Sequence, residues 1–400
     1  MNEKRFLENL ETLGQIGWKE GEGLFRTAFS PLFAEGRDFV SELMKSAGMD
    51  VRVDGVGNLF GKYPGSGEGA RTVLLGSHLD SVPGGGKYDG HLGVVAALEA
   101  AQALHEKGPH RHALEVVGFN AEEGGEMGGT FGSRAVCGDL GPLPDAAALE
   151  SLGLSEEKIA AARMDLSNYL CYLEMHIEQG PVLWRRQIPV GIPTAIVGIT
   201  RYRVEIEGEA NHAGTTPMEE RKDAMKGATR LLSSWYDWLD AEIARADRPE
   251  FVCNVGSFSL QPGAAPVVPG LASFVLELRS TQDTVVGMLA DRFRKLLPAA
   301  ELPAKMSLMV EKPAVELDPE LRTQIRAVCD EMKFECLDMP SGAGHDASPM
   351  ARHLPSAMLF VPSIRGISHS REEKSDATDM VRGVKVLERL VERLDSRDSI

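Results

Sequence analysis

Short apolar segments that end in polar residues dominate the first half of the chain. They are "TVLLGSH" (72–78), "ALEVVGFNAEE" (113–123) and "CYLEMHIEQG" (171–180), and a helical pattern at 91–108 separates the first two. Buried strands combined with helices are typical of an α/β fold whose sheet is covered on both faces. Because ligands in such folds bind at the carboxyl ends of the strands, these polar residues are the first candidates for a site.

A different pattern occupies the middle of the chain, between Gly198 and Pro313. There "TRYRVEIEGEA" (200–210) strictly alternates apolar and polar residues, as a strand with one buried face does. From that strand onward the predicted order is strand, helix, two strands, a helix near 281–297 and a last strand. This is the order of a split βαβ, or ferredoxin-like, domain.

The simplest architecture is one α/β catalytic domain that is interrupted by an inserted α+β lid or dimerisation domain. The sequence predicts that residues 1–198 and 315–400 form the first and that residues 199–314 form the second. Within the insert, Thr216 and Glu219 have the spacing of a capping box and are expected to start the long helix.

Composition excludes several classes of partner. The net charge of −16 leaves no basic surface of the kind that binds nucleic acid or anionic membranes. No apolar run approaches a membrane span, and the charged first residues lack the apolar core of a signal peptide. The five cysteines are scattered without a C-x-x-C pair, which favours a reducing compartment over a disulfide framework. We therefore expect a cytoplasmic protein that binds neither nucleic acid nor membrane.

The loop "GSHLDSVPGGGKYDG" (76–90) places one histidine and two aspartates among five glycines. His78 ends a strand and can bind a metal through one ring nitrogen, while Asp80 is placed to accept the N–H of the other. Asp89 closes the loop. Since glycines let the backbone fold tightly around an ion, the loop has the character of half a metal site.

Three more strand ends carry suitable donors. Glu122 and Glu123 end one strand, His176 lies at the end of another, and His369 follows "FVPSIRGIS". Histidines and carboxylates in this arrangement suit a pair of divalent ions about 3.5–4 Å apart with a bridging carboxylate. Because neighbouring side chains diverge, one of the two glutamates would be a ligand and the other a general base that activates water.

Together the motifs resemble the dinuclear zinc peptidase–amidase superfamily and, within it, the hydantoinase/carbamoylase branch. The resemblance covers nearly the whole chain and rests on "GSHLDSVPGGGKYDG", "AEEGG", "LEMHIEQG", "NHAGTTPM", "VVPG…LELRS", "SGAGHDA" and "PSIRGISH". It implies two divalent ions per subunit, drawn from Zn, Mn, Co and Ni. The implied ligands are His78, Asp89 and His176 for one ion, and Asp89, Glu123 and His369 for the other, with Asp89 bridging.

The same resemblance places substrate recognition largely in the insert. His212 of "NHAGTTPM" corresponds to a histidine that stabilises the oxyanion across a dimer interface, so a homodimer through the insert is implied. Arg279 of "LELRS" corresponds to the arginine that pairs with the substrate carboxylate, a bidentate role that suits a guanidinium. Gln179 corresponds to a substrate-contacting glutamine, and Gly344 and His345 of "SGAGHDA" are expected near the substrate.

The implied reaction is hydrolysis of the C–N bond of an N-carbamoyl (ureido) or N-acyl L-amino acid or a related small carboxylate, with Glu122 as general base. His176 favours an amidase, because the peptidase relatives carry a carboxylate there, and so it disfavours an aminoacylase or dipeptidase. An allantoate-type ureide amidohydrolase remains open, since Pro266 stands where a substrate-binding asparagine is expected. A non-enzymatic metal-binding protein is the remaining alternative, and it would not need Glu122.

Five further histidines lie outside these motifs and have no matching partners. We expect surface or loop positions for His91, His105, His110, His112 and His353. The chain contains neither a G-x-S-x-G elbow nor an H-E-x-x-H motif, so serine-hydrolase and zincin chemistry are both disfavoured.

Overall fold

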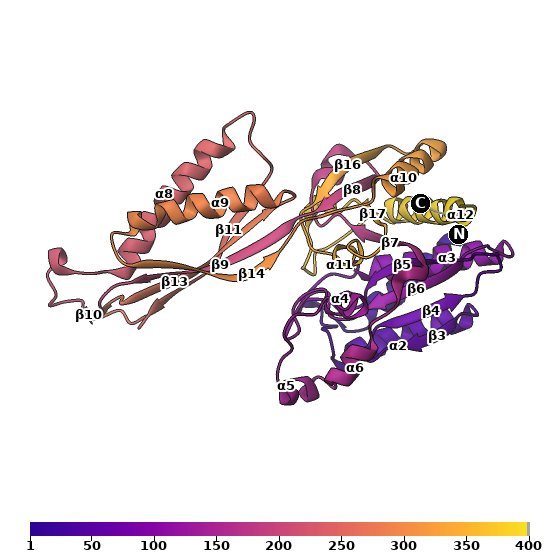
Figure 1. Cartoon of the computed structure of the whole chain (residues 1–400), viewed down its shortest axis with the longest axis horizontal. Coiled ribbons are helices and arrows are strands. Elements are labelled where there is room, and N and C mark those ends of the chain that lie inside the picture. Colours follow the sequence, from indigo (N-terminus) through magenta and orange to yellow (C-terminus); the bar gives the residue numbers. More distant parts are fainter. Residues whose placement is uncertain (398–400) are drawn as a thin grey trace. The chain divides into compact units, whose positions relative to one another are not determined.

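The computed structural model describes residues 1–397, and the chain divides into two compact units (Figure 1). A discontinuous unit is formed by Met1–Ile196 and Glu316–Ile400, and an inserted unit by Val197–Val315. The first is an α/β unit and the second an α+β unit, so the predicted fold class is confirmed.

The discontinuous unit is built on one large mixed sheet. Its strands are β3 (Asp50–Val53), β4 (Leu59–Tyr63), β5 (Thr72–His78), β6 (Ala113–Phe119), β7 (Tyr169–Ile177), β8 (Val190–Ile196), β15 (Val315–Glu316), β16 (Cys336–Ser341) and β17 (Ser356–Val361). Within the described residues their order is β15-β8-β17-β7-β5-β6-β4-β3, with β16 beside β8. The central strands β6, β5, β7 and β17 run parallel, so their carboxyl ends meet at one edge. A small ribbon of β1 (Trp18–Lys19) and β2 (Gly23–Leu24) lies apart from this sheet.

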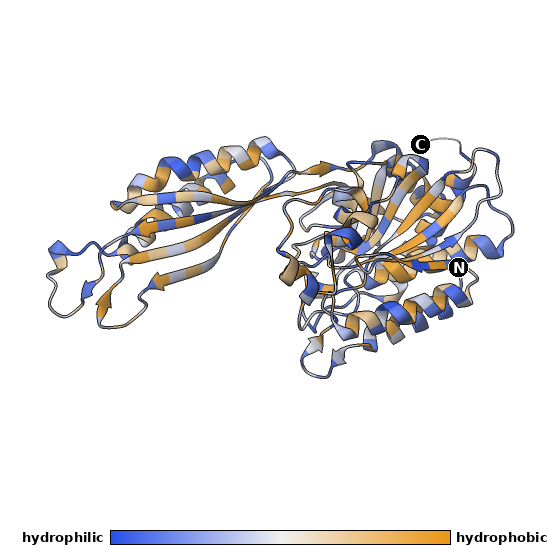
Figure 2. Ribbon diagram, turned by 60° about the horizontal axis from the view of Figure 1, so that its bottom comes forward, coloured by the Kyte–Doolittle hydropathy of each residue, from blue (hydrophilic) through white to orange (hydrophobic). Residues whose placement is uncertain are grey.

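Helices pack on both faces of this sheet. They are α1 (Glu3–Gln15), α2 (Pro31–Ser46), α3 (His91–Glu106), α4 (Phe131–Cys137), α5 (Ala146–Ser151), α6 (Glu156–Ala161), α7 (Val182–Arg186), α10 (Pro319–Met332), α11 (Ala347–Met350) and α12 (Ala377–Asp395). Alternate residues of β5 enter different cores: Val73 and Leu75 pack with Val95 of α3, and Leu74 packs with Val136 of α4. Each such side chain contributes about 1.5–3 kcal/mol on burial. The apolar colouring of the central strands in Figure 2 shows why the sheet forms the core.

The inserted unit has one four-stranded antiparallel sheet with two helices on one face. The sheet consists of β9 (Gly198–Glu207), β11 (Val252–Gln261), β13 (Leu271–Ser280) and β14 (Ala304–Lys312), and the helices are α8 (Ala224–Ile243) and α9 (Asp283–Leu296). Two short strands, β10 (Asn211–His212) and β12 (Val267–Val268), lie outside this sheet. The sheet order is β11-β13-β9-β14, while β10 and β12 pair with each other. Val204 and Ile206 of β9 pack with Trp235 of α8, whereas Arg201 and Arg203 are on the open face. The predicted split βαβ order is confirmed.

The start of α8 differs from the prediction. The helix begins at Ala224 and its N-cap is Asp223, whose side chain accepts two backbone N–H bonds. The Thr216 hydroxyl instead donates to the backbone carbonyl of His212 at 2.8 Å. Pro217 is extended (φ −54°, ψ 143°), so the helix cannot start there and the predicted capping box is wrong.

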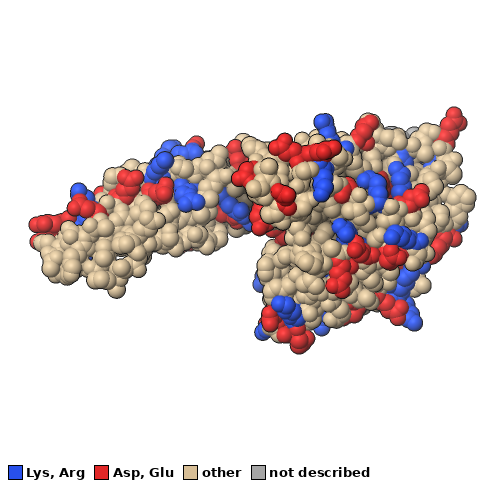
Figure 3. Space-filling view, turned by 90° about the horizontal axis from the view of Figure 1, so that it is seen from below, with Lys and Arg blue, Asp and Glu red and all other residues tan. Residues whose placement is uncertain are grey.

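On the face drawn in Figure 3, acidic and basic side chains are interspersed without a broad basic area, in line with the net charge of −16. Among residues 1–397, none of the helices combines the length and the hydrophobicity that a membrane span requires.

Candidate dinuclear metal centre

The predicted ligands gather at the carboxyl edge of the parallel strands. His78 is the last residue of β5 and His176 lies near the end of β7, while Glu123 follows β6. Asp89 precedes α3, and His369 belongs to the loop after β17. Since β5, β6, β7 and β17 are parallel neighbours, their ends bring these five side chains together, as expected for a site in an open α/β sheet.

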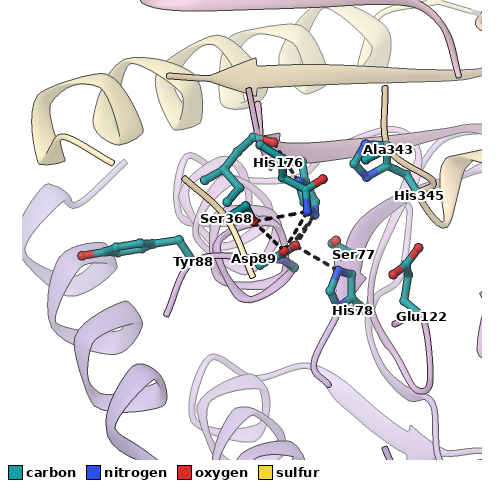
Figure 4. Close-up of polar contacts among 12 residues, drawn as sticks. Ser77, His78, Tyr88, Asp89, Glu122, His176, Ala343, His345 and Ser368 are labelled. Carbon is teal, nitrogen blue, oxygen red and sulfur yellow. Dashed lines mark hydrogen bonds and ion pairs between the residues drawn. The ribbon is translucent and has the colours of Figure 1, made fainter. Parts of the chain in front are cut away.

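Asp89 is at the centre of the group, and Figure 4 shows His78, His176 and Ser368 around it. Its Oδ1 lies 3.1 Å from His176 Nε2 and 3.6 Å from His78 Nε2. Its Oδ2 lies 3.2 Å from His369 Nε2, which is 3.3 Å from Glu123 Oε2. Asp89 thus belongs to two three-residue groups, one with His78 and His176 and one with Glu123 and His369, and in each the ligand atoms lie within 4.8 Å of one another. A third such group, Glu174, His176 and His345, does not include Asp89.

Backbone contacts orient two of the histidines. His78 Nδ1 is 3.1 Å from the carbonyl oxygen of Asp80, and His176 Nδ1 is 2.9 Å from that of Ile177. An Nδ1–H that donates to a carbonyl leaves Nε2 as the unprotonated, metal-binding nitrogen. In both rings it is Nε2 that faces Asp89.

The role of Asp80 differs from the prediction. Its carboxylate is 3.7 Å from His78 Nδ1, beyond hydrogen-bond distance, and the backbone carbonyl of the same residue takes the predicted part. The two carboxylate oxygens instead accept the backbone N–H groups of Glu122 and Glu123, each at 3.1 Å. Asp80 therefore fixes the turn that carries both glutamates.

The donor set fits divalent metal ions. Asp89 Oδ1 and Glu123 Oε1 are buried, and neither accepts a well-formed hydrogen bond from any described residue. Burial alone would raise the pKa of Asp89, but His176, His369 and His78 hold it well below its usual range, so the carboxylate is ionised. Imidazole and carboxylate donors suit Zn²⁺ and related divalent ions.

Glu122 lies beside this group without belonging to either ligand set. In Figure 4 its carboxylate is next to His78 and outside the side chains that dashed lines join. Burial raises the pKa of Glu122 well above its usual value, and the charges of Glu123, Asp346 and Asp80 add to the effect against the opposing influence of His78. The carboxyl group of Glu122 therefore binds a proton more tightly than an ordinary glutamate does, and it lies outside both ligand groups.

His345 and Gly344 line the same region. A β-carbon at Gly344 would be 4.0 Å from Glu122 Oε1, so this backbone passes close to the carboxylate. The His345 ring packs edge-on against His176 with centroids 4.5 Å apart, and its Nε2 is 2.8 Å from Ser341 Oγ. Burial, together with the charges of His176 and His78, lowers the pKa of His345 well below its usual value, so this ring is neutral.

Gln179 contacts the ligands directly. Its Nε2 donates to Asp89 Oδ2 at 2.7 Å, and its backbone N–H donates to Ser363 Oγ at 3.0 Å. The structure therefore places the predicted substrate-contacting side chain against the Asp89 carboxylate.

The remaining predicted residues belong to the inserted unit. His212 is exposed in β10, opposite Val267 of β12, and its Nδ1 accepts the backbone N–H of Gly214 at 3.0 Å. The carbonyl of Pro266 accepts the N–H of Ala213 at 2.8 Å, so Pro266 lies beside the His212 loop. Arg279 is on β13, at the far end of the strand from this loop.

Glu373 is a residue of the site that sequence reasoning missed. Its Oε1 accepts the backbone N–H groups of Tyr88 (2.9 Å) and Asp89 (3.1 Å), and its Oε2 accepts the Ser368 hydroxyl (2.8 Å). The Ser368 hydroxyl also lies 3.1 Å from Asp89 Oδ2. One buried carboxylate thus holds the Asp89 loop and the His369 loop together, and its position four residues after His369 was the available signal.

Three of the other histidines are not at the surface. His91, His110 and His112 are buried. His110 and His112 lie in the loop between α3 and β6, as predicted, whereas His91 is the first residue of α3, so the prediction is wrong for His91. Backbone carbonyls compensate the burial of these rings: His91 Nε2 is 3.1 Å from the carbonyl of Leu79, and His110 Nδ1 is 2.6 Å from that of His112. Such contacts depend on the tertiary fold and leave no local pattern.

Comparison with known proteins identifies the family. Residues 74–393 match the model of peptidase family M20/M25/M40. The chain belongs to this family. Among curated M20 relatives, an N-carbamoyl-L-amino-acid amidohydrolase of Paenarthrobacter aurescens is 35% identical over 94% of both chains. An allantoate amidohydrolase of Escherichia coli is 32% identical over 95% of both. The crystal structure of a hydantoinase/carbamoylase family amidase from Burkholderia multivorans superimposes with a TM-score of 0.84 and 29% identity, over 100% of this chain and 99% of that one. The resemblance to the hydantoinase/carbamoylase branch of the M20 family is therefore confirmed.

Proposed function

We propose that the chain is a metal-dependent amidohydrolase that cleaves the C–N bond of an N-carbamoyl or N-acyl L-amino acid. The observation that carries the proposal is the sharing of Asp89 by two ligand groups with Glu122 beside them. The relative from Paenarthrobacter aurescens is similar over 94% of the chain. Its name, N-carbamoyl-L-amino-acid amidohydrolase, gives N-carbamoyl-L-amino acids as its substrates.

His78, Asp89 and His176 would hold one divalent ion, and Asp89, Glu123 and His369 would hold the other. Two such ions polarise a carbonyl group and lower the pKa of water. The metal itself would be Zn, Mn, Co or Ni. Three observations support this assignment: the candidate ligand atoms are imidazole nitrogens and carboxylate oxygens, Asp89 Oδ1 and Glu123 Oε1 are buried without a hydrogen-bond partner among the described residues, and the Nδ1 contacts of His78 and His176 leave Nε2 to bind a metal.

The side chains of the protein then have distinct tasks. Glu122 takes the proton of the attacking water and delivers it to the leaving amine. His212 accepts at Nδ1, which leaves Nε2–H as a donor for the oxyanion. Arg279 binds the substrate carboxylate through its guanidinium. Gln179, Gly344 and His345 line the substrate region, and Asp80 keeps the two glutamates in place.

An allantoate-type ureide amidohydrolase is the second candidate. Pro266 leaves it open, because proline has no amide side chain and no N–H to donate at the position where an asparagine was expected. The Escherichia coli relative named allantoate amidohydrolase is 32% identical, close to the value for the carbamoyl relatives.

Assembly and location belong to the same proposal. A homodimer through the inserted unit would bring His212 of one subunit to the metal centre of the other, as the resemblance implies. The five scattered cysteines, which form no C-x-x-C pair, support a reducing and hence cytoplasmic location.

A substrate screen with added metals tests the proposal. The protein is freed of metal, reloaded with Zn²⁺, Mn²⁺, Co²⁺ or Ni²⁺, and assayed on N-carbamoyl, N-acetyl and N-formyl L-amino acids and on allantoate, with dipeptides as the comparison. We expect metal-dependent turnover of at least one class. Hydrolysis of dipeptides in preference to all of these would contradict the assignment as an amidase.

A further inference from the structure

Glu277 lies between two arginines on the face of the inserted sheet that α8 and α9 leave open. It accepts a hydrogen bond from Arg279 Nε at Oε1 (2.8 Å) and another from Arg201 Nε at Oε2 (2.6 Å). Glu277 of β13 is directly opposite Arg201 of β9, and Arg279 is two residues further along β13. Cross-strand partners and residues two apart on a strand share one face. We call these three residues the Arg–Glu–Arg cluster.

The cluster is only partly open to solvent. The side chain of Glu277 is 16% exposed, that of Arg279 is 25% exposed and that of Arg201 is 44% exposed. Burial alone would raise the pKa of Glu277, but the hydrogen bonds from Arg279 and Arg201 hold it below its usual value. Glu277 is therefore ionised at neutral pH, and two positive groups face one negative group.

This charge count matters for carboxylate binding. Arg279 and Glu277 alone would form a neutral pair, and an approaching carboxylate would be repelled by Glu277 as well as attracted by Arg279. Arg201 cancels the charge of Glu277. Together these three side chains carry one net positive charge, which matches one substrate carboxylate.

We propose that Arg201 is a specificity-determining residue of the carboxylate subsite and that Glu277 is its positioning residue. Glu277 holds the Arg279 guanidinium through Nε, and Arg201 keeps the cluster cationic. The cluster thereby selects substrates with a single carboxylate next to the reacting amide. This inference rests on the proposed function, in which Arg279 anchors the substrate carboxylate.

Binding without turnover is measured by calorimetry with N-carbamoyl-L-alanine on the metal-loaded Glu122→Gln protein. In parallel, KM is measured on protein that keeps Glu122. Arg201→Gln should raise Kd and KM about fivefold to tenfold, with kcat changed less than twofold. N-carbamoyl-L-alaninamide, which has no carboxylate, should show no such change. Arg201→Lys keeps the charge and should retain most of the affinity.

The decisive variant removes both charges. Arg201→Gln combined with Glu277→Gln restores one net positive charge, and the amide oxygen that replaces the carboxylate can still accept the hydrogen bond from Arg279 Nε. Affinity for N-carbamoyl-L-alanine should therefore return to within about threefold of the starting protein. If the double variant binds as weakly as Arg201→Gln alone, the charge-balance role is overturned.

Arg230→Gln is the matched control. Arg230 of α8 pairs with Glu301, is 42% exposed and lies in the same unit, but on the helical side. The Arg230→Gln variant should leave Kd and KM unchanged. If Arg230→Gln and Arg201→Gln weakened binding equally, the inference would be overturned, because any positive charge in the unit would then contribute to carboxylate binding.

The outcomes separate the inference from the proposed function. Binding that responds to Arg201 while no amide is hydrolysed would overturn the proposed function alone. If the protein hydrolyses the amide but Arg201→Gln changes neither Kd nor KM, the inference alone is overturned. If N-carbamoyl-L-alanine does not bind at all, the inference is overturned for this class of ligand.

Discussion

Gly90 lies directly against the imidazole ring of His78. A β-carbon at position 90 would be 2.4 Å from His78 Cε1 and Nδ1, and Gly90 has a φ of 72°, in the left-handed region. Gly90→Ala should therefore displace the ring and add backbone strain of about 1–3 kcal/mol. We expect loss of metal from the His78 group, measured by elemental analysis, and a lower free energy of unfolding in denaturant titrations.

Gly48→Ala separates the two effects. Gly48 also has a positive φ, of 83°, but a β-carbon there would meet nothing within 4 Å. This control should lose stability without losing metal. Full metal content in Gly90→Ala would show that the site tolerates a displaced His78.

The two adjacent glutamates should respond differently to substitution. Glu123 faces His369 at 3.3 Å, whereas Glu122 belongs to neither ligand group. Glu122→Gln should abolish turnover and keep two metals per subunit, because it removes a base and no ligand. Glu123→Ala should lose metal. Elemental analysis and activity on the same samples check both, and equal metal loss in the two variants would mean that the roles are exchanged.

The gathering of the five predicted ligand side chains was predictable because it follows from strand order and from the resemblance. His78 and His176 end apolar runs, and the ends of parallel strands must meet at one edge. The contacts of Asp80 and Glu373 were not predictable in the same way. Both carboxylates accept backbone N–H groups of loops that are distant in the sequence or irregular, and no periodic pattern records such contacts.

The start of α8 was missed for a related reason. Thr216 and Asp223 are both acceptable N-caps, and local propensity does not choose between them. The choice follows from the His212 loop, in which the backbone carbonyl of His212 accepts a hydrogen bond from the Thr216 hydroxyl. The β10–β12 pairing that forms this loop joins residues more than fifty positions apart.

Loss of the carboxylate anchor should depend on the substrate. Arg279→Gln should lower kcat/KM for an N-carbamoyl-L-amino acid by about a hundredfold, because a charge-assisted bidentate contact is removed. The decrease should vanish for the corresponding carboxamide. Steady-state kinetics on the acid and the amide check this, and equal losses on both would remove the anchoring role.

Pro266 should influence the substrate profile without affecting the metals. Its carbonyl accepts the Ala213 N–H beside His212, and an asparagine can keep that contact while adding an amide side chain. Pro266→Asn should therefore change the ratio of activities on N-carbamoyl amino acids and allantoate at constant metal content. An unchanged ratio would mean that position 266 does not contact substrate.

His212 provides the test of assembly. It lies in the exposed β10, on the inserted unit, and the proposed dimer would deliver it to the partner's metal centre. His212→Ala and Glu122→Gln proteins should each be inactive. In a mixed dimer, however, the His212→Ala subunit keeps its own Glu122 and receives His212 from its partner. Random reassociation makes half of the dimers mixed, each with one competent site, so activity should return to about a quarter of wild type. The measurement is turnover after reversible dissociation and mixing, with dimer composition followed by native mass spectrometry. If mixed dimers form and remain inactive, His212 serves its own subunit or takes no part in catalysis.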